Sequence, residues 1–148
     1  MPALSARQKV ALSATVAIVV VAVAGAWALQ TLGRASGYQI TVTRDGAAAK
    51  VFDLEELQAM PAREVVMQGQ EQQGPPLLAL LGDAGIESFE SVKVVGMGVR
   101  DDGVIVLTAQ QIDDHVLLDI ATRGTTKLCG PDIAWADRVR DVQRIEVR

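Results

Sequence analysis

The longest apolar segment of the chain lies near its N-terminus. Residues 10–32 carry no charged side chain. A bilayer core of about 30 Å requires roughly 20 apolar residues in a helix that rises about 1.5 Å per residue. Trp27 lies near one end of the run, where an interfacial aromatic residue is expected. The pattern predicts one transmembrane helix over residues 10–32, followed by a short linker at residues 33–37.

Basic residues flank this run unequally. Arg7 and Lys9 precede it, only Arg34 follows closely, and no acidic residue lies near either end. Because the basic excess stays on the cytoplasmic side, residues 1–9 are predicted to be cytoplasmic. Residues 38–148 are then an extracytoplasmic domain held at the cell membrane by the helix.

A cleaved signal peptide is the alternative interpretation of the same run. Ala26-Trp27-Ala28 has the small-x-small pattern of a cleavage site. The uncharged run is longer than a usual signal core, which favours the anchor. Both interpretations place the rest of the chain outside the cytoplasm.

Beyond the linker, short apolar segments alternate with turn residues. The two-residue alternation of residues 38–43 is typical of a half-buried strand, and Asp45-Gly46 indicates a turn before a returning strand at 50–52. Residues 70–74 are polar and are expected to form a loop, whereas residues 110–121 fit either a short helix or an edge strand. Further strands are expected at 63–68, 91–95, 104–107, 125–129 and 142–147.

Two short helices are predicted between these strands. Asp53 followed by Glu56 has the spacing of a capping box, and Pro61 ends that helix. Pro75-Pro76 opens a second helix, in which Leu77, Leu80 and Leu81 share one face. The fold class expected for residues 38–148 is therefore α+β, a β-rich mixed domain with short helices covering the sheet.

Composition excludes several classes of site. The 148 residues contain one Cys and one His, which excludes a disulfide scaffold, a Cys-rich zinc site, an iron–sulfur cluster and a multi-His metal site. Three of the 14 basic residues precede residue 38, so the outer domain carries 11 basic and 18 acidic groups, a net charge of −7. A domain this acidic is not expected to bind nucleic acid.

Two side chains have reactive chemistry but ordinary settings. His115 follows Asp113 and Asp114, so a role as general base competes with that of a surface histidine in an acidic loop. Cys129 is either an oxidisable or metal-binding thiol or a small buried apolar residue at a strand end. The sequence assigns no catalytic residue and no metal ligand.

Basic residues accumulate toward the C-terminus. Such groups bind a phosphate or carboxylate partner, or else form a solvated face paired with Asp137, Asp141 and Glu146. The cluster consists of Arg123, Lys127, Arg138, Arg140, Arg144 and Arg148.

Four segments share their order with a known family. They are a short helix ending in Pro (54–61), a glycine-led amphipathic helix (73–86), a late loop and strand (124–132) and a closing strand (139–147). From about Val51 to the C-terminus this order resembles the molybdopterin-binding domain of the sulfite-oxidase-like oxidoreductases. The resemblance implies that family's β-rich fold and makes molybdopterin a possible cofactor.

The same resemblance implies a Cys thiolate on molybdenum, placed ahead of the glycine-led helix. Residues 65–70 occupy that region and contain no Cys. We therefore expect a binding or accessory module that contacts a membrane-complex or redox partner protein. One alternative is a reduced molybdopterin-dependent oxidoreductase that holds the cofactor through Arg100, Arg123 and Lys127. The other is a structural subunit of a membrane complex, with Ala24-Gly25-Ala26 as a helix-packing surface.

Overall fold

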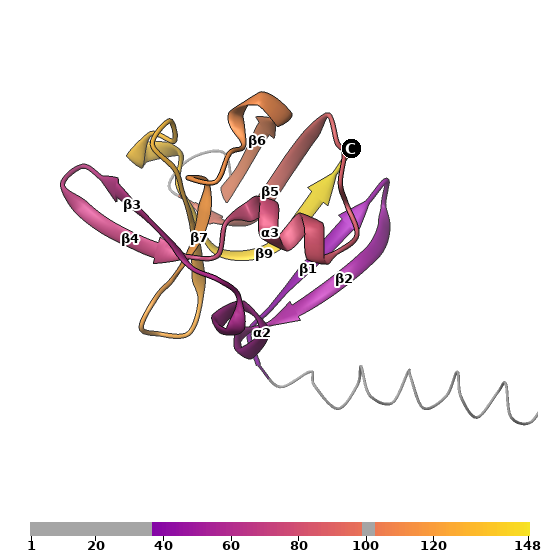
Figure 1. The fold of residues 1–148 in the computed structure, drawn as a ribbon, viewed down its shortest axis with the longest axis horizontal. Coiled ribbons are helices and arrows are strands. Elements are labelled where there is room, and N and C mark those ends of the chain that lie inside the picture. Colours follow the sequence, from indigo (N-terminus) through magenta and orange to yellow (C-terminus); the bar gives the residue numbers. More distant parts are fainter. Residues whose placement is uncertain (1–36, 99–102) are drawn as a thin grey trace, which may run out of the picture. The chain divides into compact units, whose positions relative to one another are not determined.

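The computed structural model describes residues 37–98 and 103–148 (Figure 1). The predicted cytoplasmic segment 1–9 and transmembrane helix 10–32 lie outside the described residues. Within the described ranges, no helix has the length and apolar character needed to cross a membrane. The chain divides into two units, Met1–Gly37 and Tyr38–Arg148, and the second contains all the elements below.

The second unit is rich in strands and has few helices. This composition of elements agrees with the β-rich domain that the alternating sequence pattern predicts. The elements are β1 (Gln39–Arg44), β2 (Ala47–Asp53), α2 (Leu54–Ala59), β3 (Arg63–Met67), β4 (Gln70–Gly74), α3 (Leu77–Asp83), β5 (Ser91–Gly98), β6 (Val104–Thr108), η2 (Ala109–Gln111), β7 (Leu117–Ile120), β8 (Thr126–Cys129), η3 (Trp135–Asp137) and β9 (Val139–Val147).

The main sheet has seven strands and β9 at its centre. Its order is β2-β1-β9-β5-β6, with β8 also paired to β9 and β7 paired to β8. The β1–β9 pair is parallel, and the other pairs are antiparallel. Pairing of Val42 with Ile145 joins the first and last strands, so the sheet closes only when the whole unit has folded.

The β3–β4 hairpin forms a separate two-stranded sheet beside β7 (Figure 1). Gln68 and Gly69 both have positive φ, 50° and 77°, as a tight hairpin turn requires. The expected loop over Gln70–Gly74 is wrong, because these polar residues pair in register with β3. Only Gln72 and Gly74 of β4 are buried. Because neither has an apolar side chain of the kind that marks a strand, the sequence pattern does not indicate this strand.

A close backbone approach joins β4 to β7. A Cβ on Gly74 would lie 1.9 Å from the carbonyl oxygen of Leu118. The backbone N–H of Leu118 donates to the Pro75 carbonyl at 3.0 Å, and that of Gln73 donates to Asp119 Oδ1 at 3.0 Å. Glycine at position 74 therefore allows the hairpin to dock.

Both predicted helices are present. Glu56 N donates to Asp53 Oδ1 at 2.8 Å and Asp53 N donates to Glu56 Oε2 at 3.1 Å, which confirms the capping box. In α3, Leu77, Leu80 and Leu81 are fully buried and pack into the main core. Residues 110–121, left open between helix and strand, contain the end of η2 and the whole of β7.

Two apolar clusters hold the unit together. The main cluster fills the space between the sheet and the two helices, with Ile40, Phe52 and Ile145 among its fully buried members. A smaller cluster lies under the hairpin and consists of Val65, Met67, Leu117 and Cys129. The smaller cluster borders the polar network described next.

Candidate functional site

Basic side chains from β8 and β9 and the adjoining loops surround a pocket of about 300 Å³. Lys127 of β8 pairs in register with Arg140 of β9, which places these two cations at the same level of the sheet. We call this site the basic pocket. Its lining contains four cations and no carboxylate, and consists of Ala121, Thr122, Arg123, Thr125, Thr126, Lys127, Trp135, Arg138 and Arg140.

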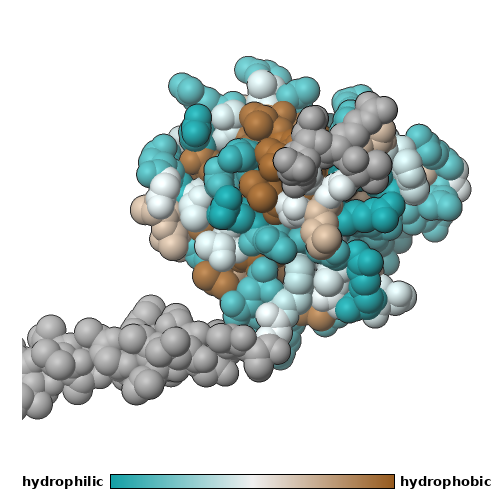
Figure 2. Space-filling model, turned by 180° about the vertical axis from the view of Figure 1, so that it is seen from behind, coloured by the Kyte–Doolittle hydropathy of each residue, from teal (hydrophilic) through white to brown (hydrophobic). Residues whose placement is uncertain are grey.

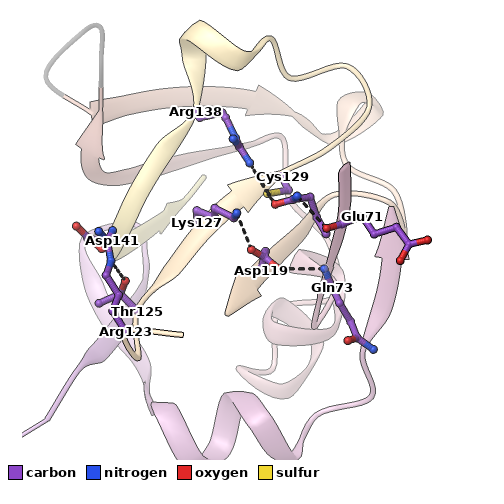
Figure 3. A network of polar contacts seen from close by, with 10 residues as sticks. Glu71, Gln73, Asp119, Arg123, Thr125, Lys127, Cys129, Arg138 and Asp141 are labelled. Carbon is purple, nitrogen blue, oxygen red and sulfur yellow. Dashed lines mark hydrogen bonds and ion pairs between the residues drawn. The ribbon is translucent and has the colours of Figure 1, made fainter. Parts of the chain in front are cut away.

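Two of the four cations already have carboxylate partners (Figure 3). Arg123 Nη2 lies 2.5 Å from Asp141 Oδ1, and its Nε donates to Thr125 Oγ1 at 2.9 Å. Lys127 Nζ lies 2.9 Å from Asp119 Oδ2, across the β7–β8 pair. These ion pairs neutralise two of the four cations that line the basic pocket.

Arg138 and Arg140 have no such partner. Within residues 37–98 and 103–148, no carboxylate forms an ion pair with either guanidinium within 4.0 Å. Arg140 is exposed, whereas Arg138 is only 3% exposed. A buried cation without a counter-charge carries a desolvation penalty of roughly several kcal/mol.

Polar and aromatic groups surround the Arg138 guanidinium. Its Nη2 donates to Gln72 Oε1 at 3.3 Å and to Cys129 Sγ at 3.6 Å (Figure 3). The ring centroid of Trp135 lies 3.6 Å from its Cζ, a cation–π contact. Its Nε is buried and has no hydrogen-bond partner in the described part of the chain.

Cys129 lies at the inner end of this network. Its side chain is fully buried, and its Sγ is 3.7 Å from Gln72 Oε1. Burial raises the pKa of the Cys129 thiol, although the Arg138 guanidinium acts in the opposite direction. The structure thus agrees with the buried, apolar interpretation of this residue, to which it adds contacts with Gln72 and Arg138.

The structure brings together two of the three residues predicted to bind the cofactor. Arg123 and Lys127 line the basic pocket, and Arg100 lies outside the described residues. The C-terminal basic cluster divides between the two ends of β9. Arg144 and Arg148 line a larger open hollow of about 1170 Å³ at the far end, where Arg144 pairs with Glu146 at 2.6 Å.

His115 is an exposed loop residue. Its Nδ1 lies 3.5 Å from Asp113 Oδ2, with both side chains more than half exposed. The backbone N–H of His115 lowers the pKa of the Asp113 carboxyl. Among the described residues, no three His, Cys, Asp or Glu side chains converge on a metal position.

Sequence reasoning missed Gln72 and the burial of Arg138. Gln72 belongs to a strand that was expected to be a loop, and Arg138 was grouped with exposed basic residues. Gly74 is the one feature of the sequence that could have indicated the docking of this strand, because a glycine at the end of a polar segment can mark a close backbone contact. That contact seats Gln72 against Arg138.

The surface also carries exposed apolar side chains. Figure 2 shows small groups of apolar residues on the reverse face, among hydrophilic neighbours. Met97 of β5 is 60% exposed and Val106 of β6 is 58% exposed. Exposed apolar side chains are common on folded proteins.

The fold is shared with a solved enzyme. A chain in the crystal structure of the sulfane dehydrogenase SoxCD from Paracoccus pantotrophus superposes with a TM-score of 0.59 and 18% sequence identity. The match covers 74% of this chain and 38% of that chain, so this chain corresponds to less than half of that one. No family model matches the sequence, and no curated protein does. At this level of identity the match shows a shared fold alone.

Proposed function

We propose that residues 38–148 form a membrane-anchored, extracytoplasmic binding or accessory module on a sulfite-oxidase-like fold. The β-rich architecture shared with a sulfane dehydrogenase supports the fold component. The proposed binding role rests on the buried position of Cys129, which is the only thiol of the chain. A thiol sealed inside the protein favours a binding role over independent metal-dependent redox chemistry.

The residues present do not fit the metal centre that the resemblance implies. That centre requires a Cys thiolate ahead of α3, where β3 and the Gln68-Gly69 turn contain no Cys. Cys129 packs against this hairpin and is fully buried. Burial raises the pKa of its thiol, so the neutral form is favoured over the thiolate. Because the thiolate is the form that binds metal, this site lacks a suitable protein donor.

The basic pocket does suit the anionic part of a ligand. Arg123 and Lys127 line it, although each already pairs with a carboxylate. Molybdopterin therefore remains a candidate ligand through its phosphate, with no protein thiolate on its metal. A role as carrier, sensor or partner-binding subunit follows from such a site, and the anchor at residues 10–32 would hold it beside a membrane complex or redox partner.

The test is the cofactor content of the full chain. The protein is produced in a host that makes molybdopterin and purified in mild detergent. Molybdenum is measured by elemental analysis, and pterin by fluorescence after oxidation. We expect far less than one equivalent of molybdenum. One equivalent of both metal and pterin would overturn the proposal and make the chain an oxidoreductase.

A further inference from the structure

β6 is the last strand on one side of the main sheet, next to β5 (Figure 1). At its end, the backbone N–H of Thr108 donates to Gln111 Oε1 at 2.9 Å and so points away from β5. Because alternate residues of an antiparallel strand direct their backbone groups to the same side, Val104 and Val106 also direct N–H and C=O groups outward. In the described part of the chain, no group outside the sheet bonds to either backbone. This edge therefore offers donors and acceptors to one further strand.

The sequence of β6 leaves this edge unprotected. Edge strands are commonly protected against further pairing by charged side chains, Pro or β-bulges. β6 reads Val-Ile-Val-Leu-Thr, and its register with β5 is regular from Val104 to Thr108. β2, the opposite edge strand, carries Lys50, and its pairing with β1 has a register shift. Strand addition is therefore expected at β6 rather than at β2.

An apolar strip lies along the outer side of this edge. Successive side chains of a strand face opposite sides of a sheet, so Leu107 is 5% exposed in the main core whereas Val106 is 58% exposed. Val104 lies on the same side as Val106 and pairs in register with Val95 of β5. A strand added beside β6 would cover Val106 with one of its own side chains.

The charged groups beside this strip have a net positive charge. Lys93 pairs in register with Val106 on one side and with Glu146 of β9 on the other. Glu146 Oε2 lies 3.2 Å from Lys93 Nζ, and Glu146 Oε1 lies 2.6 Å from Arg144 Nε. One carboxylate therefore serves two cations, whereas the domain as a whole has a net charge of −7.

The segment that joins β5 to β6 begins well away from these charges. Residues 99–102 contain one Arg and two Asp and lie outside the described residues. β5 carries the chain about 17 Å from Lys93 to Gly98 before this segment begins, at about 3.3 Å per residue. That distance exceeds the screening length of about 8 Å in physiological salt. The charge beside Val106 is therefore set by Lys93, Arg144 and Glu146.

We propose that the β6 edge binds an extended segment of a partner protein, which adds a strand to the main sheet and places an apolar side chain on Val106 between acidic ones. The paired backbones supply affinity, and the alternate side chains supply specificity. Acidic residues complement the charge of Lys93 and Arg144. A second copy pairing through its own β6 would bring no carboxylate, because β6 contains none. This inference rests on the proposed function, because it names how the binding module holds its partner.

The test is titration of the full chain, in a zwitterionic detergent, with the peptide Thr-Glu-Thr-Val-Thr-Glu-Thr, acetylated and amidated at its ends. Isothermal titration calorimetry measures the affinity. One control peptide has lysine in place of both glutamates, and another has an N-methyl group on the valine nitrogen, which removes the N–H that would pair with Val106. We expect saturable binding of the first peptide and binding about tenfold or more weaker for each control. Equal affinities for the three peptides would overturn the proposal.

Two variants of the chain locate the binding edge. Val106→Glu adds a like charge beside the peptide and should weaken binding by about tenfold or more. Val66→Glu is the matched control, because Val66 is 63% exposed on β3 and receives the same change of charge. Its affinity should equal that of the wild type. Equal losses in the two variants would overturn the proposal.

Self-association is the competing outcome. Light scattering measures the mass of the wild type and of Val106→Glu in the same detergent. A wild-type dimer that binds no peptide and separates in Val106→Glu would assign the edge to a second copy and overturn the proposal.

The two proposals fail separately. No peptide binding in a chain that also lacks molybdenum refutes the edge site and leaves the binding module. Stoichiometric molybdenum in a chain that binds the peptide at β6 refutes the binding module and leaves the edge site.

Discussion

The Nη2 atom of Arg138 lies 3.6 Å from the Sγ of Cys129, and both side chains are buried. Gln72 Oε1 accepts from both groups, so β4, β8 and the residue before β9 meet at one amide oxygen. This contact decides the chemistry available to the thiol and to the guanidinium. Gln72 and Arg138 contribute to the stability of the domain through these contacts, and Arg138 also contributes to the positive charge of the basic pocket.

The Cys129 thiol should be protected in the folded protein. Burial excludes reagents and raises the thiol pKa, so little thiolate forms at neutral pH. Ellman's reagent is expected to label the native chain slowly and to label one thiol per chain after unfolding in urea. The native rate should rise with pH, as more thiol ionises. Complete labelling of the native chain at the rate of a free thiol would contradict the burial.

Gln72 should contribute far more to stability than its neighbour Gln73. Gln72→Ala removes the acceptor shared by Arg138 and Cys129 and leaves a buried cation less solvated, a loss of about 3 kcal/mol in the free energy of unfolding. Gln73→Ala is the control, because that side chain is exposed and should change stability by less than about 0.5 kcal/mol. Urea denaturation measures both, and equal effects would show that the buried amide is not needed.

Gly74 should not tolerate a side chain. The added Cβ in Gly74→Ala meets the Leu118 carbonyl oxygen at 1.9 Å, a backbone clash that only undocking of β4 from β7 relieves. We expect destabilisation by more than about 3 kcal/mol. Gly82→Ala, in α3 with open space around it, should stabilise the chain by about 0.5 to 1 kcal/mol. Thermal unfolding of the two variants checks the contrast, and a neutral Gly74→Ala would disprove the close approach.

Tyr38 should make the domain sensitive to alkaline pH. Its hydroxyl is within hydrogen-bond distance of Thr126 Oγ1, at 2.7 Å, and donates to the Val142 carbonyl. Burial raises its pKa above the usual value of about 10. A raised folded pKa means that the contribution to stability is complete below the unfolded pKa and is lost as pH rises toward the folded one.

Tyr38→Phe tests this dependence. The variant should lose about 1 kcal/mol at neutral pH, because the hydrogen bonds are removed. It should also lose less stability than the wild type as the pH rises from about 9 through the unfolded pKa of about 10 toward the raised folded pKa of Tyr38. Urea denaturation of both proteins across this alkaline range measures the difference. Parallel pH profiles of the two proteins would exclude ionisation of Tyr38 as the cause.

Local patterns in the sequence predict much of this fold. The Asp53 capping box, the leucine face of α3 and the alternation in β1 each report a local preference, and each is confirmed. Strand β4 was not predicted, because Gln70–Gly74 contains no apolar side chain. Its strand conformation arises from pairing with β3 and docking on β7, and sequence periodicity does not report such tertiary contacts.

The candidate site was predictable only in part. Arg100, Arg123 and Lys127 were expected to hold the cofactor together in the alternative oxidoreductase hypothesis. The structure places Arg123 and Lys127 at the basic pocket, and Arg100 lies outside the described residues. No sequence pattern indicates that Arg138 is buried while Arg140 is exposed, because the pairing of β8 with β9 and the fold of η3 decide this. Spacing along one strand shows which residues share a face, and burial depends on what packs against that face.

We propose that Cys129, the only thiol of this chain, does not hold a metal. The most direct measurement is the molybdenum content per chain of the wild type beside Cys129→Ser, both produced in a host that makes molybdopterin. We expect far less than one equivalent in both proteins, with no difference between them. Close to one equivalent in the wild type that disappears in Cys129→Ser would contradict it and would identify Cys129 as a metal ligand.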